Sequence, residues 1–224
     1  MGIVIRQSVN TSLVTYIGFG LGYISTLFLF PLFLSAEQIG VTRLLISIAM
    51  LFSTFASLGA GQICSRFFTY FKNNKEERES FLFFLLLIGF AGSLFFGIAF
   101  FVLQNTIIST YSSKAVLFIR YLYYLIPLTI ILIFSNILES YSVINQRPVV
   151  PSSVREIGIR FVIIIGVSCV ALRLFDFDYF VIFFIVAYAV VPFALIAYLA
   201  KEKLFFHRLN FFVFRSSIFK EIIT

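Results

Sequence analysis

The chain contains six blocks of apolar residues, and each block is about as long as a helix that crosses a lipid bilayer. Such a helix needs roughly 20 apolar residues to cross a hydrocarbon layer about 30 Å thick. Short polar or charged breaks separate the blocks, which cover residues 12–34, 41–67, 81–103, 115–138, 154–172 and 179–199. The pattern predicts an all-α fold, a polytopic membrane bundle of six transmembrane helices.

The composition supports a membrane protein over a soluble one. Hydrophobic residues make up 61% of the chain and charged residues 12%, which leaves too little polar surface to cover a soluble globule. The apolar runs, such as Phe81–Ile88, are continuous and lack the period-two alternation of β-barrel strands. Because a lone segment in hydrocarbon must satisfy its backbone hydrogen bonds internally, we expect helices surrounded by membrane lipids.

Lysine and arginine are distributed unevenly among the breaks. If the N-terminus is cytoplasmic, 13 of the 17 Lys and Arg residues flank the inner ends of the blocks, and the outer side holds only Arg43, Lys114, Arg120 and Arg173. Because inner loops carry the excess of positive charge, we expect a multi-pass protein of the cytoplasmic (inner) membrane with both ends in the cytoplasm. The basic residues form no long run, so the net charge of +7 does not indicate a nucleic-acid partner.

The breaks also bear on domain organisation. We expect residues 1–200 to form one six-helix lobe, because no break is long enough for a soluble catalytic domain. Residues 201–215 mix Leu, Phe and Val with Lys, His and Arg, which is typical of an amphipathic segment on the inner membrane surface. Residues 216–224 have apolar residues at helical spacing and begin a further helix. We therefore expect a fragment of a longer protein or a half-length product.

Residue types that support enzymatic chemistry are sparse. His207 is the only histidine, and no Cys or His cluster at metal-ligand spacing and no glycine loop for phosphate binding occurs. The carboxylates of Asp176 and Asp178 belong to a short outer turn, where we expect them to be solvated. The sequence predicts no metal, no cofactor and no enzymatic activity.

Charged residues near the block ends are the candidates for a binding site, because a charge at the centre of a membrane helix costs ~2.5–3.5 kcal/mol and usually faces an interior or a watery cavity. Glu156 precedes Arg160 by four residues, on one helix face beside Arg155. This group is either an intrahelical pair with headgroup contacts or a site in which Arg160 binds a phosphate. Glu139, at the end of the fourth block, is either exposed or pairs with Arg155 or Arg160 as a gate.

Three more arginines lie at block ends, where a long side chain can also extend to the lipid headgroups. Arg66 ends the second block on the cytoplasmic side, as a topology anchor or as a ligand for an anion. Arg43 and Arg120 lie at outer ends, where the positive-inside rule disfavours arginine, so they are better functional candidates. Two glycine clusters, Gly18–Gly22 and Gly89–Gly97, allow close helix packing, although glycine is common in membrane helices.

Several motifs follow one another in an order that is found in a known family. The first block closes on Phe30-Pro31-Leu32-Phe33-Leu34 and continues into the turn Ser35-Ala36-Glu37-Gln38-Ile39-Gly40. The second block ends with Leu58-Gly59 followed by Arg66-Phe67, and Asn145-Gln146-Arg147-Pro148 leads into Arg155. This order resembles the N-terminal half of the polysaccharide flippases, a branch of the multidrug/oligosaccharidyl-lipid/polysaccharide exporter superfamily.

The resemblance implies that the chain is one lobe of a two-lobe exporter, completed by a C-terminal lobe or by a second copy. Its substrate would be an oligosaccharide linked through pyrophosphate to a polyprenyl lipid. Alternating access would move this lipid to the outer leaflet, for the synthesis of a surface polysaccharide such as lipopolysaccharide. Arg66, Arg155 and Arg160 would then capture the pyrophosphate near the inner leaflet, and Arg43 and Arg120 would receive it outside.

Two other functions remain open at this point. A drug or organic-cation exporter of the same superfamily would need carboxylates inside the membrane, and only Glu139 and Glu156 are near. A half-length membrane partner that transports nothing and only supports a complex is the second alternative. The predominance of arginine over carboxylate favours an anionic ligand.

Overall fold

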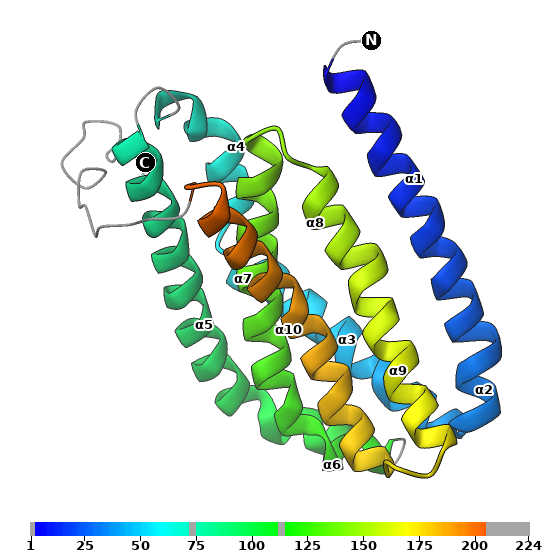
Figure 1. The fold of residues 1–224 in the computed structure, drawn as a ribbon. Coiled ribbons are helices and arrows are strands. Elements are labelled where there is room, and N and C mark those ends of the chain that lie inside the picture. The colour runs from blue at the N-terminus through cyan, green and yellow to red at the C-terminus, as the bar shows by residue number, and fades with distance from the viewer. Residues whose placement is uncertain (1–2, 72–74, 112–114, 205–224) are drawn as a thin grey trace.

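The computed structural model describes residues 3–71, 75–111 and 115–204, with side chains from Ile5 in the first range and from Glu77 in the second. The regular secondary structure of these residues is helical throughout, which confirms the predicted all-α bundle (Figure 1). The predicted amphipathic segment beyond Leu204, the further helix at 216–224 and Lys114 lie outside the described residues.

The described helical stretches follow one another up and down the bundle, and the first turn of α1 and the last turn of α10 lie at the same end (Figure 1). Two of the turns, η1 and η3, are π-helical, and η2 is a 3-10 turn. The elements are α1 Ile3–Ile24, η1 Ser25–Leu29, α2 Phe30–Phe33, α3 Ala36–Ala56, α4 Ala60–Phe71, α5 Lys75–Tyr111, α6 Val116–Arg120, η2 Leu122–Tyr124, α7 Leu125–Ile144, α8 Val149–Ser153, η3 Val154–Gly158, α9 Ile159–Ala171 and α10 Phe177–Lys201.

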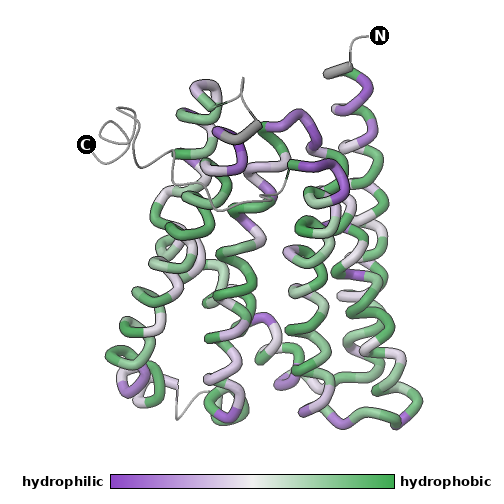
Figure 2. Tube along the Cα trace, turned by 60° about the vertical axis from the view of Figure 1, so that its left-hand side comes forward, coloured by the Kyte–Doolittle hydropathy of each residue, from purple (hydrophilic) through white to green (hydrophobic). Residues whose placement is uncertain are grey.

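Five of the described helical stretches are long and apolar enough to cross a membrane: Ile5–Phe33, Ala36–Ala56, Glu77–Tyr111, Leu122–Ile144 and Phe177–Lys201. The predicted span at 154–172 corresponds to η3 and α9, is helical as far as Ala171, and is not among these five. Most of the chain is hydrophobic along the length of the bundle, and hydrophilic residues lie mainly toward its two ends, with more of them at the end that holds the N-terminus (Figure 2). Large exposed side chains such as Phe55, Phe95 and Phe193 suit lipid and would promote aggregation in water.

The predicted second span, 41–67, is wrong as a single helix. The helix α3 ends at Ala56 and α4 begins at Ala60, because Leu58 and Gly59 adopt left-handed backbone conformations with φ of 48° and 73°. Glycine occupies such a conformation at little cost, which makes Leu58-Gly59 an effective helix stop. The start of α3 is defined by a capping box, in which the Ser35 hydroxyl accepts from the backbone N–H of Gln38 and the Gln38 side chain accepts from that of Ser35.

The predicted fourth span, 115–138, is also displaced. A short helix, α6, ends at Arg120, and after the turn at Tyr121 and η2 the long helix α7 runs from Leu125 to Ile144. Pro127 lies in the first turn of α7, where the missing backbone N–H would have no helical partner in any case. Pro127 therefore fits within the first turn of α7, near the start of the span Leu122–Ile144.

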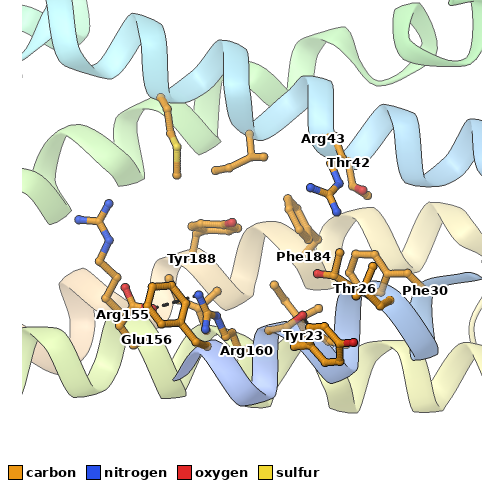
Figure 3. A pocket seen from close by; sticks show the side chains of 18 residues that line it. Tyr23, Thr26, Phe30, Thr42, Arg43, Arg155, Glu156, Arg160, Phe184 and Tyr188 are labelled. Carbon is orange, nitrogen blue, oxygen red and sulfur yellow. Dashed lines mark hydrogen bonds and ion pairs between the residues drawn. The ribbon is translucent and has the colours of Figure 1, made fainter. Parts of the chain in front are cut away.

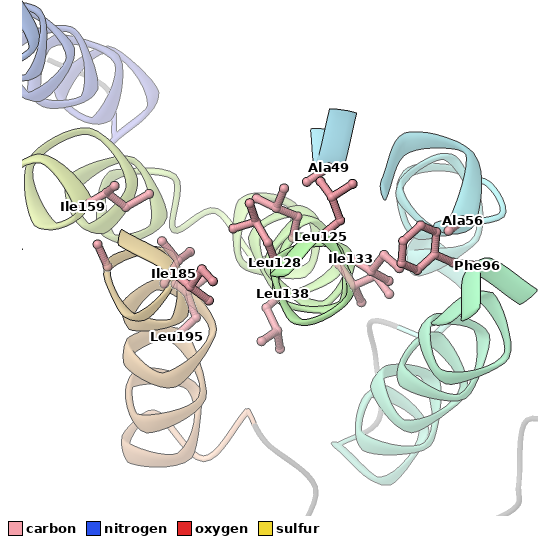
Figure 4. Packing of buried hydrophobic residues seen from close by; sticks show 14 of the residues in the cluster. Ala49, Ala56, Phe96, Leu125, Leu128, Ile133, Leu138, Ile159, Ile185 and Leu195 are labelled. Carbon is pink, nitrogen blue, oxygen red and sulfur yellow. The ribbon is translucent and has the colours of Figure 1, made fainter. Parts of the chain in front are cut away.

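The centre of the bundle is α7, which packs against α3, α4, α5 and α10. Its side chains Leu125, Leu128, Ile133 and Leu138 are buried between α3 and α5 on one side and α10 on the other (Figure 4). The helix α1 lies at the edge, and its main partner is the helical stretch formed by α8, η3 and α9 (Figure 1). This arrangement leaves room between α1, α3 and α10.

Candidate functional site

A cavity of about 700 Å³ lies between α1, α3 and α10, and we call it the arginine cavity (Figure 3). Its walls come from α1, η1 and α2 on one side, α3 on another, and η3, α9 and α10 on the third. Three of the five predicted arginines line it, together with one of the two predicted carboxylates. The charged and polar lining residues are Arg43, Arg155, Arg160, Glu156, Ser25, Thr26, Thr42, Tyr23 and Tyr188.

Two ion pairs hold the arginines of η3 and α9. The Arg155 guanidinium donates to Glu139 of α7, with Nη1 and Oε2 2.7 Å apart, and Arg160 pairs with Glu156 across 3.0 Å on its own helical stretch. The side chains of Arg160 and Glu156 are about a quarter exposed, so solvent screens this pair less than a surface pair. In the other pair Glu139 is 16% exposed and Arg155 is 45% exposed. Of the two predicted gating residues, Glu156 lines the cavity and Glu139 reaches it through Arg155.

The Arg160 guanidinium rests in a notch on α1 that glycine makes possible. A Cβ atom at Gly22 would lie 2.9 Å from Cζ and Nη1 of Arg160, and one at Gly18 would lie 2.7 Å from Cβ of Glu156. The Phe19 ring is between these glycines in the sequence, with its centroid 5.9 Å from Cζ of Arg160. The glycine pattern predicted close helix packing; in the structure Gly18 and Gly22 lie against the ion pair of Glu156 and Arg160.

One nitrogen of Arg160 has no protein partner. Its Nη1 atom is buried and makes no hydrogen bond within the described part of the chain. A buried charged donor without a partner is costly, and a ligand that accepts a hydrogen bond from it would remove that cost. Arg160 is therefore held by Glu156 through Nη2, whereas Nη1 lies against Gly18 and Gly22 of α1 and becomes available to an anion when the side chain moves.

Arg43 reaches into the cavity from α3, across from Arg160 (Figure 3). Unlike the other two arginines of the cavity, it forms no ion pair with any residue that the structure describes. The neighbouring Thr42 is buried, and its hydroxyl donates to the Ile39 carbonyl. The Thr42 proton is therefore not available to a ligand bound at Arg43. Arg43 is the uncompensated positive charge of the cavity.

Both π-helical turns contribute lining residues, a feature that the sequence analysis did not predict. The turn η1 supplies Ser25, Thr26 and Leu27, and η3 supplies Arg155 and Glu156. π-helical turns are rare in proteins, and those that do occur are frequently found at functional sites. The signal for η1 is Pro31, which cannot donate to the carbonyl four residues earlier, so the preceding turn can widen.

The two remaining arginines lie elsewhere. Arg66 is exposed on α4, beside the Phe67 ring at 5.4 Å. Arg120 pairs with Asp178 at the start of α10, with Nη2 and Oδ2 2.6 Å apart, and the Tyr121 hydroxyl also donates to this carboxylate. Asp178 was expected to be solvated; it is half-exposed and ties α6 to α10. The structure brings neither Arg66 nor Arg120 to the arginine cavity.

The pair of Arg120 and Asp178 is expected to contribute little to stability, because both side chains are at least half exposed and screened by solvent. We expect Asp178→Asn to lower the free energy of unfolding by less than about 1 kcal/mol. Thermal unfolding of the purified protein in detergent at low and high salt measures this effect. A large, salt-independent loss would contradict the prediction.

The aromatic residues that line the cavity were not predicted from the sequence. Phe184 and Tyr188 project from α10 between Arg43 and Arg160, and Tyr23 lies on the α1 side (Figure 3). Aromatic residues are so frequent in this chain, with 32 Phe and 11 Tyr, that these three carried no signal. Comparisons with known proteins add nothing to these positions: no family model, no curated protein and no solved structure matches the chain.

Proposed function

We propose that the protein is a membrane transporter of the flippase type, which moves a polyprenyl-pyrophosphate-linked oligosaccharide across the cytoplasmic membrane by alternating access. The observation that carries the proposal is the convergence of Arg43, Arg155 and Arg160 on one cavity between apolar helices. In this proposal both ends of the chain are cytoplasmic, as the distribution of Lys and Arg predicts.

The balance of charge in the cavity favours an anionic ligand. Three guanidinium groups meet two carboxylates, those of Glu139 and Glu156, and each carboxylate is already engaged by an arginine. Within the described residues, Arg43 has no ion-pair partner and Nη1 of Arg160 has no hydrogen-bond partner. Guanidinium groups bind phosphate oxygens through directed hydrogen bonds, so two of them lining one cavity suit a pyrophosphate.

The surroundings of the arginines suit a ligand with a lipid tail. The volume of about 700 Å³ lies within the range of roughly 300–1,000 Å³ that ligand pockets occupy. Exposed side chains of α1 and η1, including Tyr23 and Leu27, continue from the cavity to the outside of the bundle, where a polyprenyl chain would lie in the bilayer. Transporters bind their substrates between two lobes, so a C-terminal lobe or a second copy would close the cavity.

The organic-cation exporter has less support. A cationic drug would need a carboxylate that is free to receive it, and Glu139 and Glu156 are both within 3.0 Å of an arginine nitrogen. A non-transporting membrane partner does not by itself account for the three arginines that line the cavity. Transport of an anionic lipid is therefore the function that these contacts favour.

The test compares arginines inside and outside the cavity. The first variant is Arg43→Gln, and the second combines Arg160→Gln with Glu156→Gln so that no lone carboxylate remains. We expect each variant to weaken binding of polyprenyl pyrophosphate by roughly tenfold to a hundredfold, as loss of a charge-assisted hydrogen bond does. The matched controls, Arg66→Gln and Arg120→Gln, should leave the affinity unchanged. Binding is measured with the full chain in nanodiscs of zwitterionic lipid.

Movement of the lipid is measured separately, with the same variants in liposomes that contain a fluorescent polyprenyl pyrophosphate. Equal effects of all four arginine variants on binding would contradict the proposal. Binding without movement would favour the membrane partner, and uptake of a fluorescent organic cation in place of the lipid would favour the drug exporter.

A further inference from the structure

A second cavity, of about 540 Å³, runs along the N-terminal half of α1 where this helix meets the connection before α8. We call it the hydroxyl groove, because most of its lining side chains carry a hydroxyl group and none is charged. Its lining residues are Gln7, Ser8, Thr11, Ser12, Thr15, Tyr16, Phe19 and Pro148. The Gln7 amide donates to the Gln146 carbonyl at 2.7 Å and so ties the end of α1 to this connection.

One hydroxyl of the groove is left without a partner. Ser and Thr in the helices of this chain commonly donate to a carbonyl three or four residues earlier, as Thr15 does to Thr11. The Thr11 hydroxyl oxygen is buried and makes no hydrogen bond with any described residue. Because a buried polar atom without a partner is costly, a ligand that hydrogen-bonds to Thr11 would be stabilised there.

The groove meets the arginine cavity at Phe19, which lines both. The Phe19 ring also lies beside the Arg160 guanidinium. Thr15 in the groove and Gly22 under Arg160 are seven residues apart on α1, about 10 Å along the helix axis. A ligand whose phosphate contacts Arg160 would therefore reach the groove with groups that extend about 10 Å along α1.

We propose that the hydroxyl groove binds the first sugar units of a glycan whose phosphate end lies in the arginine cavity; this inference rests on the proposed function. Hydroxyl and amide side chains offer both donors and acceptors to sugar hydroxyls. The exposed rings of Tyr16 and Phe19 offer apolar faces to the C–H groups of a sugar ring. A charged ligand would find no countercharge among these residues, so the groove suits the neutral part of the molecule.

The experiment measures how much the sugar adds to the affinity. Three probes are compared with the full chain in phosphatidylcholine nanodiscs: polyprenyl pyrophosphate, the same lipid carrying an N-acetylglucosamine disaccharide, and the free disaccharide. We expect the sugar-bearing lipid to bind about fivefold more tightly than the bare lipid, or better, as two or more hydrogen bonds would give. Thr11→Val with Thr15→Val should reduce this ratio to about one and leave the affinity for the bare lipid unchanged.

The matched control is Thr129→Val, because the Thr129 hydroxyl is also buried and has no partner among the described residues, but lies in α7, outside both cavities. Thr11→Ser with Thr15→Ser keeps both hydroxyls and should keep the ratio. Since the chain has no tryptophan, Tyr16→Trp provides a single fluorescent reporter, whose emission should shift with the sugar-bearing lipid and not with the bare lipid. This reporter tests the inference even if the valine variant does not fold.

The outcomes separate this inference from the proposed function. Arginine-dependent binding of the bare lipid with no gain from the sugar would overturn the groove and leave the flippase proposal intact. Binding of neither lipid would overturn both. Free disaccharide that binds as tightly as the sugar-bearing lipid would assign the groove to a soluble sugar and overturn the continuity with the arginine cavity.

Discussion

Gly92→Ala is expected to cause the largest loss of stability among the glycine substitutions in this chain. A Cβ atom at Gly92 would overlap the carbonyl oxygen of Ala56, where α5 crosses the end of α3. The obstacle is backbone and cannot rotate away, so α3 and α5 would have to separate. We expect a loss at or above the upper end of the roughly 1–3 kcal/mol that overpacking costs.

Thermal unfolding in detergent measures this loss, and Gly97→Ala is the matched control on the same helix. A Cβ atom at Gly97 meets nothing within 4 Å, so this variant should unfold at or slightly above the temperature of the unchanged protein. Equal unfolding temperatures for the two variants would show that the contact between Gly92 and Ala56 is not as close as described.

Gly22→Ala is expected to abolish most of the anion binding without a comparable loss of stability. The new Cβ atom would lie 2.9 Å from the Arg160 guanidinium, which is the mobile end of a long side chain and can be displaced. Displacement moves the free donor of Arg160 away from the ligand and disturbs its pair with Glu156. We expect the affinity for polyprenyl pyrophosphate to fall by tenfold or more, in line with loss of a charge-assisted hydrogen bond.

Gly20→Ala is the control for this prediction, since a Cβ atom at Gly20 meets nothing within 4 Å. Both variants have the same helix propensity on the same helix, so a difference in affinity between them reports the position of Arg160. Unchanged affinity and unchanged unfolding temperature for Gly22→Ala would mean that the notch on α1 does not hold the guanidinium.

The sequence predicted the helical class of the fold well, because hydrophobic blocks of bilayer length leave the backbone few alternatives. It did not predict where the blocks break. Leu58-Gly59 stops α3 within the second block, and Pro127 starts α7 within the fourth. Glycine and proline occur in continuous membrane helices as well, so their presence alone does not mark the position of a break.

The candidate site was predicted in part. Charge in an apolar block singled out Arg43, Arg155 and Arg160, which line one cavity, but the same argument selected Arg66 and Arg120, which do not. Position along the chain gives the depth of a side chain in the membrane and leaves its direction around the helix undetermined. The partner of Arg120 illustrates this limit, because Asp178 lies 58 residues away in the sequence.

The wide turn η1 changes which side chains share a face of the first helical stretch. A π turn holds one residue more than an α turn, so the residues beyond it are rotated by about 100° from the positions that a uniform helical wheel gives. Phe30, which follows η1, is buried against Phe180 and still belongs to the lining that includes Gly22 and Tyr23. Deleting one residue of η1 would therefore rotate α2, including the cavity-lining Phe30, by about 100° around the helix axis. The notch at Gly18 and Gly22 precedes η1 and would keep its orientation.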